Sequence, residues 1–83
     1  MASPRRVFAA VLLGRGTINF RDLERLLIRL GFRLDRVSGS HHIYRHPNAT
    51  RPLNIQPVGK DAKPYQIRQL RDMTEEFQLT LEE

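Results

Sequence analysis

Three histidines, His41, His42 and His46, fall within one short segment. An imidazole can ligate a metal ion, or it can take up and release a proton at the pH of a cell. In an extended segment His41 and His42 point to opposite faces, and His42 and His46 stand roughly 13 Å apart at about 3.3 Å per residue. Zinc needs ligand bonds of about 2 Å. We therefore expect acid–base chemistry here and no bound metal.

A metal-free ribonuclease needs little more than such a histidine and nearby cations. A base removes the proton of a ribose 2′-hydroxyl, which attacks the adjacent phosphate, and cations stabilise the charge on the phosphoryl oxygens. His41 stands where a Gly-Ser turn meets an expected strand, and the cations that could assist it are Arg45, Lys60 and Lys63. The plainer alternative is a surface histidine, or one with only a structural hydrogen bond.

Two amphipathic helices are expected to position this segment. The first begins at its cap Asn19 and ends at Gly31, and apolar residues recur along it at helical spacing. The second begins at Pro64 and extends to about Gln78. A shorter helix that ends at Gly14 is expected ahead of both.

Three short strands are expected between the two amphipathic helices. They cover residues 32–37, 41–46 and 52–56, and a loop follows at 57–63. The turns between them are short, which predicts an antiparallel meander. Two helices can cover one face of such a sheet and leave the other face wet, so the expected fold is a two-layer α+β domain.

The middle strand decides which histidine reaches solvent. Only one of Ile43 and Tyr44 can face the core, and we expect Ile43 to do so. Tyr44 would then share the wet face with His42 and His46, where it could stack on an unpaired base. His41 would lie on the Ile43 side and reach solvent at the rim of the sheet.

Composition limits the classes of function. The chain has 83 residues and no cysteine, so it forms one domain without disulfides, thiol catalysis or thiolate metal sites. All 14 Lys and Arg residues lie in residues 1–71, whereas residues 72–83 carry five acids and no cation. A basic body of this kind favours polyanions, nucleic acid first. No apolar run approaches the roughly 18 residues of a membrane-spanning helix.

Basic side chains are the expected RNA contacts. Arg21, Arg25 and Arg29 form one stripe on the first amphipathic helix, which could track phosphates or could be a solvated face. Lys60 and Lys63 lie beside the start of the last helix, where two cations and a helix N-terminus attract a phosphate.

The chain resembles a known family in several motifs at once. Gly31-Phe32 followed by residues 37–47 (VSGSHHIYRHP) resembles the HicA toxin family, which has a helix ending in Gly-Phe, a Gly-Ser-His turn, an apolar–aromatic strand and a His-Pro turn. Residues 53–69 resemble a variant branch with an Ala-Lys-Pro-Tyr-Gln segment. The resemblance covers roughly residues 17–79, which leaves an N-terminal extension at 1–16 with a short helix and an acidic tail at 80–83.

The resemblance implies a fold like that of a double-stranded-RNA-binding domain, in the order α-β-β-β-α. It also implies a cytoplasmic toxin of a type II toxin–antitoxin system that cleaves messenger RNA without a metal or cofactor. A HicB-like antitoxin would cover the site, and the free toxin would be a monomer. Carried over, His41 is catalytic with His42 as the alternate, and Ser40, Tyr44 and Arg45 join the RNA contacts.

One departure from the family pattern leaves other functions open. Many members carry Pro-x-His after the third strand, whereas residues 56–59 (QPVG) contain no histidine. The alternatives are a non-catalytic RNA-binding module of the same fold, or a protein-binding domain with an acidic partner.

Overall fold

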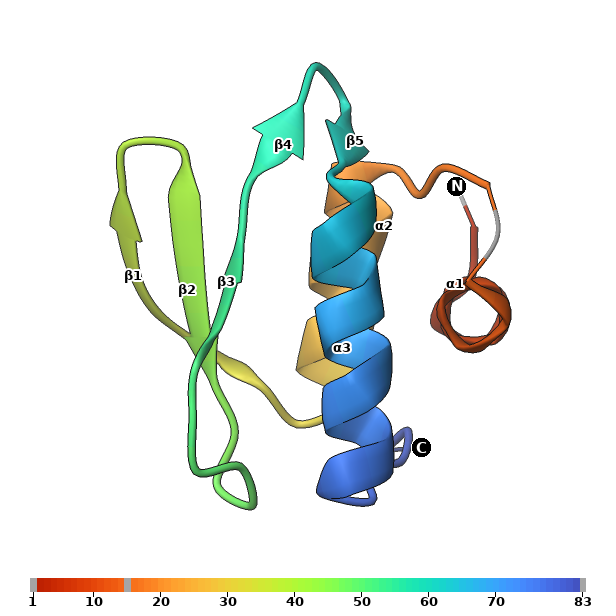
Figure 1. The fold of residues 1–83 in the computed structure, drawn as a ribbon, viewed down its shortest axis with the longest axis vertical. Coiled ribbons are helices and arrows are strands. Elements are labelled where there is room, and N and C mark those ends of the chain that lie inside the picture. Colours follow the sequence, from red (N-terminus) through yellow and green to blue (C-terminus); the bar gives the residue numbers. More distant parts are fainter. Residues whose placement is uncertain (1, 15, 83) are drawn as a thin grey trace.

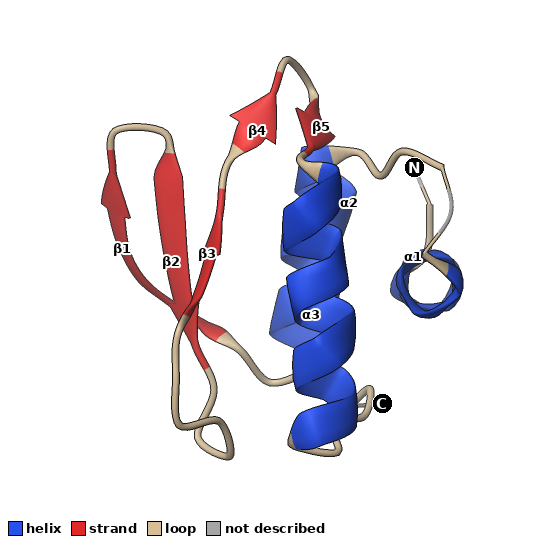
Figure 2. Ribbon diagram, in the orientation of Figure 1, coloured by secondary structure: helices blue, strands red, loops and turns tan. Residues whose placement is uncertain are grey.

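Two helices lie against one face of a three-stranded sheet in the computed structural model, which describes residues 2–14 and 16–82 (Figure 1). The helices are α2 (Phe20–Arg29) and α3 (Pro64–Glu76), and the strands are β1 (Arg33–Ser38), β2 (His41–Arg45) and β3 (Leu53–Ile55). The strands are antiparallel in the order β1-β2-β3. Figure 2 shows the two layers, and they confirm the predicted α+β fold with its antiparallel meander.

The helix boundaries follow from their caps. Asn19 accepts hydrogen bonds through Oδ1 from the backbone N–H groups of Arg21 and Asp22, at 3.0 and 3.2 Å. These bonds satisfy donors that the first turn of α2 would otherwise leave unpaired. Pro64 opens α3, and this helix ends at Glu76, close to the predicted Gln78.

A third helix, α1 (Pro4–Leu13), packs on α2 and α3 on the side away from the sheet. Its Val7 and Val11 are buried, so this helix adds to the core. No helix in the described residues is long and apolar enough to cross a membrane.

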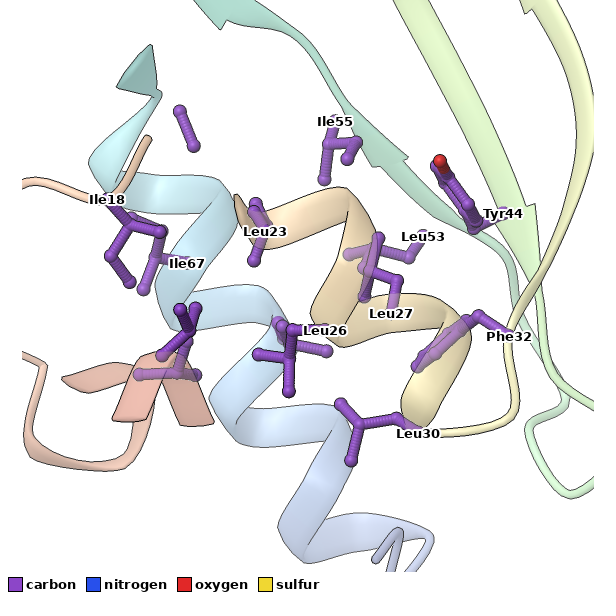
Figure 3. Close-up of a cluster of buried hydrophobic side chains, with 14 of the residues drawn as sticks. Ile18, Leu23, Leu26, Leu27, Leu30, Phe32, Tyr44, Leu53, Ile55 and Ile67 are labelled. Atoms are coloured by element: carbon purple, nitrogen blue, oxygen red, sulfur yellow. The ribbon is translucent and has the colours of Figure 1, made fainter. Parts of the chain in front are cut away.

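The core lies between the helices and the sheet. Figure 3 shows the leucines of α2 directed at apolar side chains of α3 and of the strands. The fully buried leucines of α2 and the residues of β3 opposite them are Leu23, Leu26, Leu27, Leu53 and Ile55. The helical spacing predicted this stripe, and its burial makes α2 the central element of the fold.

Residues 57–63, predicted to be a loop, contain a small hairpin of β4 (Pro57–Val58) and β5 (Asp61–Ala62). The backbone N–H of Phe20 donates to Lys60 O at 2.8 Å, and that of Ala62 donates to Ile18 O at 2.9 Å. The hairpin is thereby fixed to the start of α2. Strands of two residues are too short to show alternation, so no periodic pattern predicts them.

The predicted orientation of β2 is wrong. Tyr44 is 3% exposed and faces the helices, whereas Ile43 is only partly buried. In the register, Tyr44 is opposite Leu53 and His42 is opposite Ile55, and directly paired residues share a face. The buried pair on β3 therefore fixes the phase of β2, that is, which of its residues face the helices. The Tyr44 hydroxyl donates to Glu24 Oε2 on α2 at 2.7 Å, which satisfies its polar end.

His46 is also buried, although solvent exposure was predicted. It follows β2, and its Nε2 lies 2.8 Å from the carbonyl oxygen of Leu30, to which it donates. Its Nδ1 accepts from the backbone N–H of Asn48 at 3.0 Å, so the ring is the neutral Nε2–H tautomer. The ring also meets Phe32 edge-on, with centroids 5.1 Å apart. This histidine has a structural role.

Residues that follow α3 fold back onto α2. Leu79 is buried, the Glu82 N–H donates to Arg29 O at 2.7 Å, and Arg29 Nε donates to Glu82 O at 3.0 Å. The described part of the predicted acidic tail is therefore attached to the C-terminal end of α2.

The close approach of Gly31 to His46 gives a stability prediction. Gly31 has φ +97°, and a Cβ there would lie 2.8 Å from His46 Nε2, the donor to Leu30. Gly31→Ala should lower the free energy of unfolding by at least about 1 kcal/mol more than the control Gly16→Ala, because it disturbs a buried hydrogen bond in addition to the backbone cost. Gly16 has φ +71° and open space around it. Urea unfolding measures the free energy of unfolding of both variants. Equal losses in the two would contradict the close packing of Gly31 against His46.

Tyr44 gives a pH prediction. Burial, its hydrogen bond to Glu24 and the Glu24 charge raise the pKa of this phenol above its ordinary value. The unfolded chain therefore releases this proton at a lower pH than the folded chain, so the stabilisation is complete below about pH 10 and is lost progressively above it. Urea unfolding between pH 9 and 11 should show a steeper loss for the wild type than for Tyr44→Phe. Parallel curves would be inconsistent with the buried phenol.

Candidate functional site

His41 is the first residue of β2 and follows the turn that joins it to β1. Gly39 has φ +60° in this turn, a conformation that glycine adopts readily and that tight hairpins use. Because Tyr44 faces the helices, alternation places His41 on the opposite, outer face of the sheet, where it is exposed. The corrected phase of β2 thus gives His41 free access to solvent.

Asn54 holds the His41 ring. Nδ1 of His41 lies 3.1 Å from Oδ1 of Asn54, the central residue of β3. An amide oxygen only accepts, so Nδ1 carries the hydrogen and donates it. The lone pair of Nε2 is then open to solvent and can accept a proton. This is the arrangement that a general base requires.

The turn that carries His41 is connected to α3 through side chains. Gln56 Nε2 donates to Ser40 Oγ at 3.3 Å, and the Gln56 backbone N–H donates to Gln66 Oε1 at 2.7 Å. Gln66 is 2% exposed, so its amide is fixed within the protein. Ser40, a predicted RNA contact, therefore has a hydrogen bond that helps to hold the turn.

Basic residues of β1 and β2 share the outer face with His41. The register pairs Arg36 with Ile43 and Arg33 with Arg45, across a bulge between Leu34 and Arg36. Arg45 forms an ion pair with Asp35 at 3.5 Å and lies at the far end of β2 from His41. Arg36, which the sequence analysis did not single out, is the cation nearer to His41 in the register.

His42 lies on the other face and belongs to a different group of side chains. Its Nδ1 is 3.1 Å from Glu24 Oε2, the atom that also accepts the Tyr44 hydroxyl. Its ring meets Phe20 edge-on, with centroids 5.0 Å apart. His41 and His42 therefore diverge, as strand geometry predicted, and they cannot act together on one phosphate.

A cleft of about 310 Å³ lies beside His42, between the start of α2 and the β4–β5 hairpin. Arg21 and Lys60, both predicted RNA contacts, line it together with Glu24 and His42. A larger hollow of about 940 Å³ lies at the opposite end of the sheet. It is lined by apolar residues such as Phe32, by charged residues that include Arg45 and Glu82, and by the structural His46, both of whose ring nitrogens are already hydrogen-bonded.

The other predicted contacts are dispersed. Arg25 forms an ion pair with Asp22, and Arg29 is bound to the chain end as described above. Lys63 precedes α3 and does not line the cleft. Tyr44 is buried, so its ring offers no surface for a base to stack on. In the described residues, no group of three His, Cys, Asp or Glu side chains is arranged to hold a metal ion.

Besides Arg36, the sequence analysis missed three residues that complete these two groups: Asn54, Glu24 and Gln56. The alternation of Leu53, Asn54 and Ile55 gave a signal for Asn54, because a polar residue between two core residues must face outward. Glu24 and Gln56 gave none. Their partners are distant in the sequence, and only the packing of α2 and α3 on the sheet brings them together.

Comparison with known proteins shows the family to which the chain belongs. The family model described as HicA toxin of bacterial toxin-antitoxin matches residues 20–75, which include α2, the whole sheet and most of α3. Neither a curated protein nor a solved structure was found to match the chain. The match covers well over half of the 83 residues and both groups around His41 and His42. The chain therefore belongs to the HicA toxin family of bacterial toxin–antitoxin systems.

Proposed function

We propose that this protein is a metal-independent endoribonuclease that cleaves messenger RNA, with His41 as the catalytic base. The observation that carries the proposal is the geometry of His41. The side chain is exposed, and Asn54 holds its Nδ1 so that Nε2 is open. Family membership supports RNA cleavage as the reaction of a toxin with this residue in its Gly-Ser-His turn.

The reaction needs one proton acceptor and a cation. Nε2 of His41 takes the proton of a ribose 2′-hydroxyl, and the O2′ forms a bond to the adjacent phosphorus as the P–O5′ bond breaks. The products are a 2′,3′-cyclic phosphate and a 5′-hydroxyl, whose oxygen takes a proton from solvent. Donation from Nδ1 to the Asn54 amide stabilises the imidazolium that forms.

Arg36 is the cation best placed to stabilise the phosphoryl charge. The register places it on the outer face, opposite Ile43 and close to the first residue of β2. Its side chain is exposed and has no hydrogen-bond or ion-pair partner among the described residues. A charge-assisted hydrogen bond from this guanidinium to a phosphate oxygen would strengthen as charge develops in the transition state.

The outer face is also the surface that an inhibitory partner must cover. It presents His41 and several arginines on an open sheet, so a HicB-like antitoxin with acidic side chains would block both base and cations. We place the toxin and its antitoxin in the cytoplasm, where messenger RNA is available.

Substitution of His41 tests the base. The wild-type protein should cleave single-stranded RNA in excess EDTA, and His41→Ala should lower the rate by about 10²–10⁴-fold, because the proton acceptor is lost. The variant is purified in the same way as the wild type, so that a contaminating ribonuclease would appear equally in both. Equal cleavage by the two proteins would refute the assignment of His41 as the catalytic base. RNA binding without cleavage by either would favour a non-catalytic module.

Substitution of Asn54 tests the positioning of that base. Asn54→Ala should lower kcat with little change in KM, because the ring loses its acceptor while the RNA contacts remain. Asn54→Asp should retain more activity than Asn54→Ala, since a carboxylate oxygen accepts from Nδ1 equally well. Initial rates over a range of RNA concentrations separate kcat from KM. A rise in KM with kcat unchanged would mean that Asn54 binds RNA instead.

A further inference from the structure

Two basic side chains line the cleft beside His42 without taking part in an interaction within the described protein. Lys60 is exposed at the turn of the β4–β5 hairpin, and Arg21 is exposed in the first turn of α2. Neither side chain has a hydrogen-bond or ion-pair partner among the described residues. The other arginines of α2 are engaged, because Arg25 pairs with Asp22 and Arg29 binds a carbonyl oxygen.

The walls of the cleft are held in place by backbone and side-chain bonds. Phe20 N–H donates to Lys60 O at 2.8 Å, so the hairpin that carries one cation is bonded to the helix that carries the other. His42 forms a wall between Phe20 and Glu24, within contact of both. The two cations therefore converge on a preformed space, and binding there needs little ordering of the chain.

The carboxylate of Glu24 offsets only one of the two cations that line the cleft, so the cleft keeps a net positive charge. Oε2 of Glu24 already accepts the Tyr44 hydroxyl and lies 3.1 Å from His42 Nδ1. The first-turn N–H groups of Arg21 and Asp22 are used by the Asn19 cap, so the ligand would be held by side chains.

We propose that this cleft is a phosphate subsite for the RNA strand, held by Lys60 and Arg21 and separate from the position where the strand is cut. The subsite lies at the same end of the molecule as His41, since the β1–β2 turn, the β4–β5 hairpin and the start of α2 are all at the upper end in Figure 1. A strand that enters over this end can place one phosphate in the cleft and the next nucleotides on the outer face.

Binding of an uncleavable RNA tests the subsite. Because the ligand is the RNA of the proposed function, the probe is a fluorescein-labelled single-stranded oligonucleotide with 2′-O-methyl groups at every position, which has no nucleophile. Its Kd is measured by fluorescence anisotropy at several salt concentrations. Lys60→Ala should weaken binding and reduce the slope of log Kd against log salt by about 0.7, the value for one lost phosphate contact on a single strand. Arg21→Ala should weaken binding and reduce the slope by a similar amount. Lys60→Arg keeps the positive charge, so its slope should equal that of the wild type.

Arg68→Ala is the matched control, because Arg68 is an exposed cation on α3 that borders none of the hollows described above. If the control weakens binding as much as Lys60→Ala, only the net charge of the protein matters and the subsite is refuted. Failure of the wild type to bind the probe also refutes it. Binding that is sensitive to Lys60, in a protein that cuts no RNA, would retain the subsite and reject the proposed cleavage.

Kinetics of the cleavable RNA distinguish positioning from chemistry. Lys60→Ala should raise KM and leave kcat nearly unchanged, because the phosphate in the cleft is held equally in the ground state and the transition state. A loss in kcat with KM unchanged would show that the scissile phosphate itself lies in the cleft, and it would overturn the separation from His41.

Discussion

The orientation of strand β2 depends on the contacts beneath it, and the carboxylate of Glu24 makes two of them. This carboxylate lies on α2 and receives the hydroxyl of Tyr44 and the Nδ1 of His42 from the strand that packs above it. Two polar groups can therefore enter the layer between helix and sheet without losing their hydrogen bonds. Once Tyr44 and His42 face the helix, the alternation of β2 leaves His41 on the outer face. The orientation of the candidate base is thus set by a contact on the opposite side of its strand.

The three histidines have separate environments as a result. His41 is open to solvent on the outer face, His42 is at the edge of the core beside a cleft, and His46 is closed in by Leu30 and Phe32. Only the first has both an acceptor for one ring nitrogen and an exposed second nitrogen on the open sheet. The three histidines therefore serve three different purposes: the proposed catalytic base, one wall of the cleft, and a packed structural residue.

Much of this fold can be predicted from local sequence. Asn19, Gly31 and Pro64 mark helix ends through backbone geometry that each residue favours, and the leucine spacing identifies the buried face of α2. The phase of β2 could not be predicted in the same way, because Ile43 and Tyr44 are both apolar enough for the core. The choice depends on the pairing with Leu53 and Ile55 and on Glu24, all distant in the sequence. The same limitation hid Asn54 as the partner of His41.

The exposure of strand β1 determines how easily the region beside His41 opens locally. β1 is an edge strand, all six of its residues are exposed, and within the described residues it pairs with β2 alone. Because it buries no side chain, local opening of β1 costs far less free energy than global unfolding, and its amides should exchange with deuterium early. The turn before His41 belongs to this labile edge, whereas the leucines of α2 belong to the most protected part. The proposed activity would therefore be lost when this edge frays, while the core remains folded.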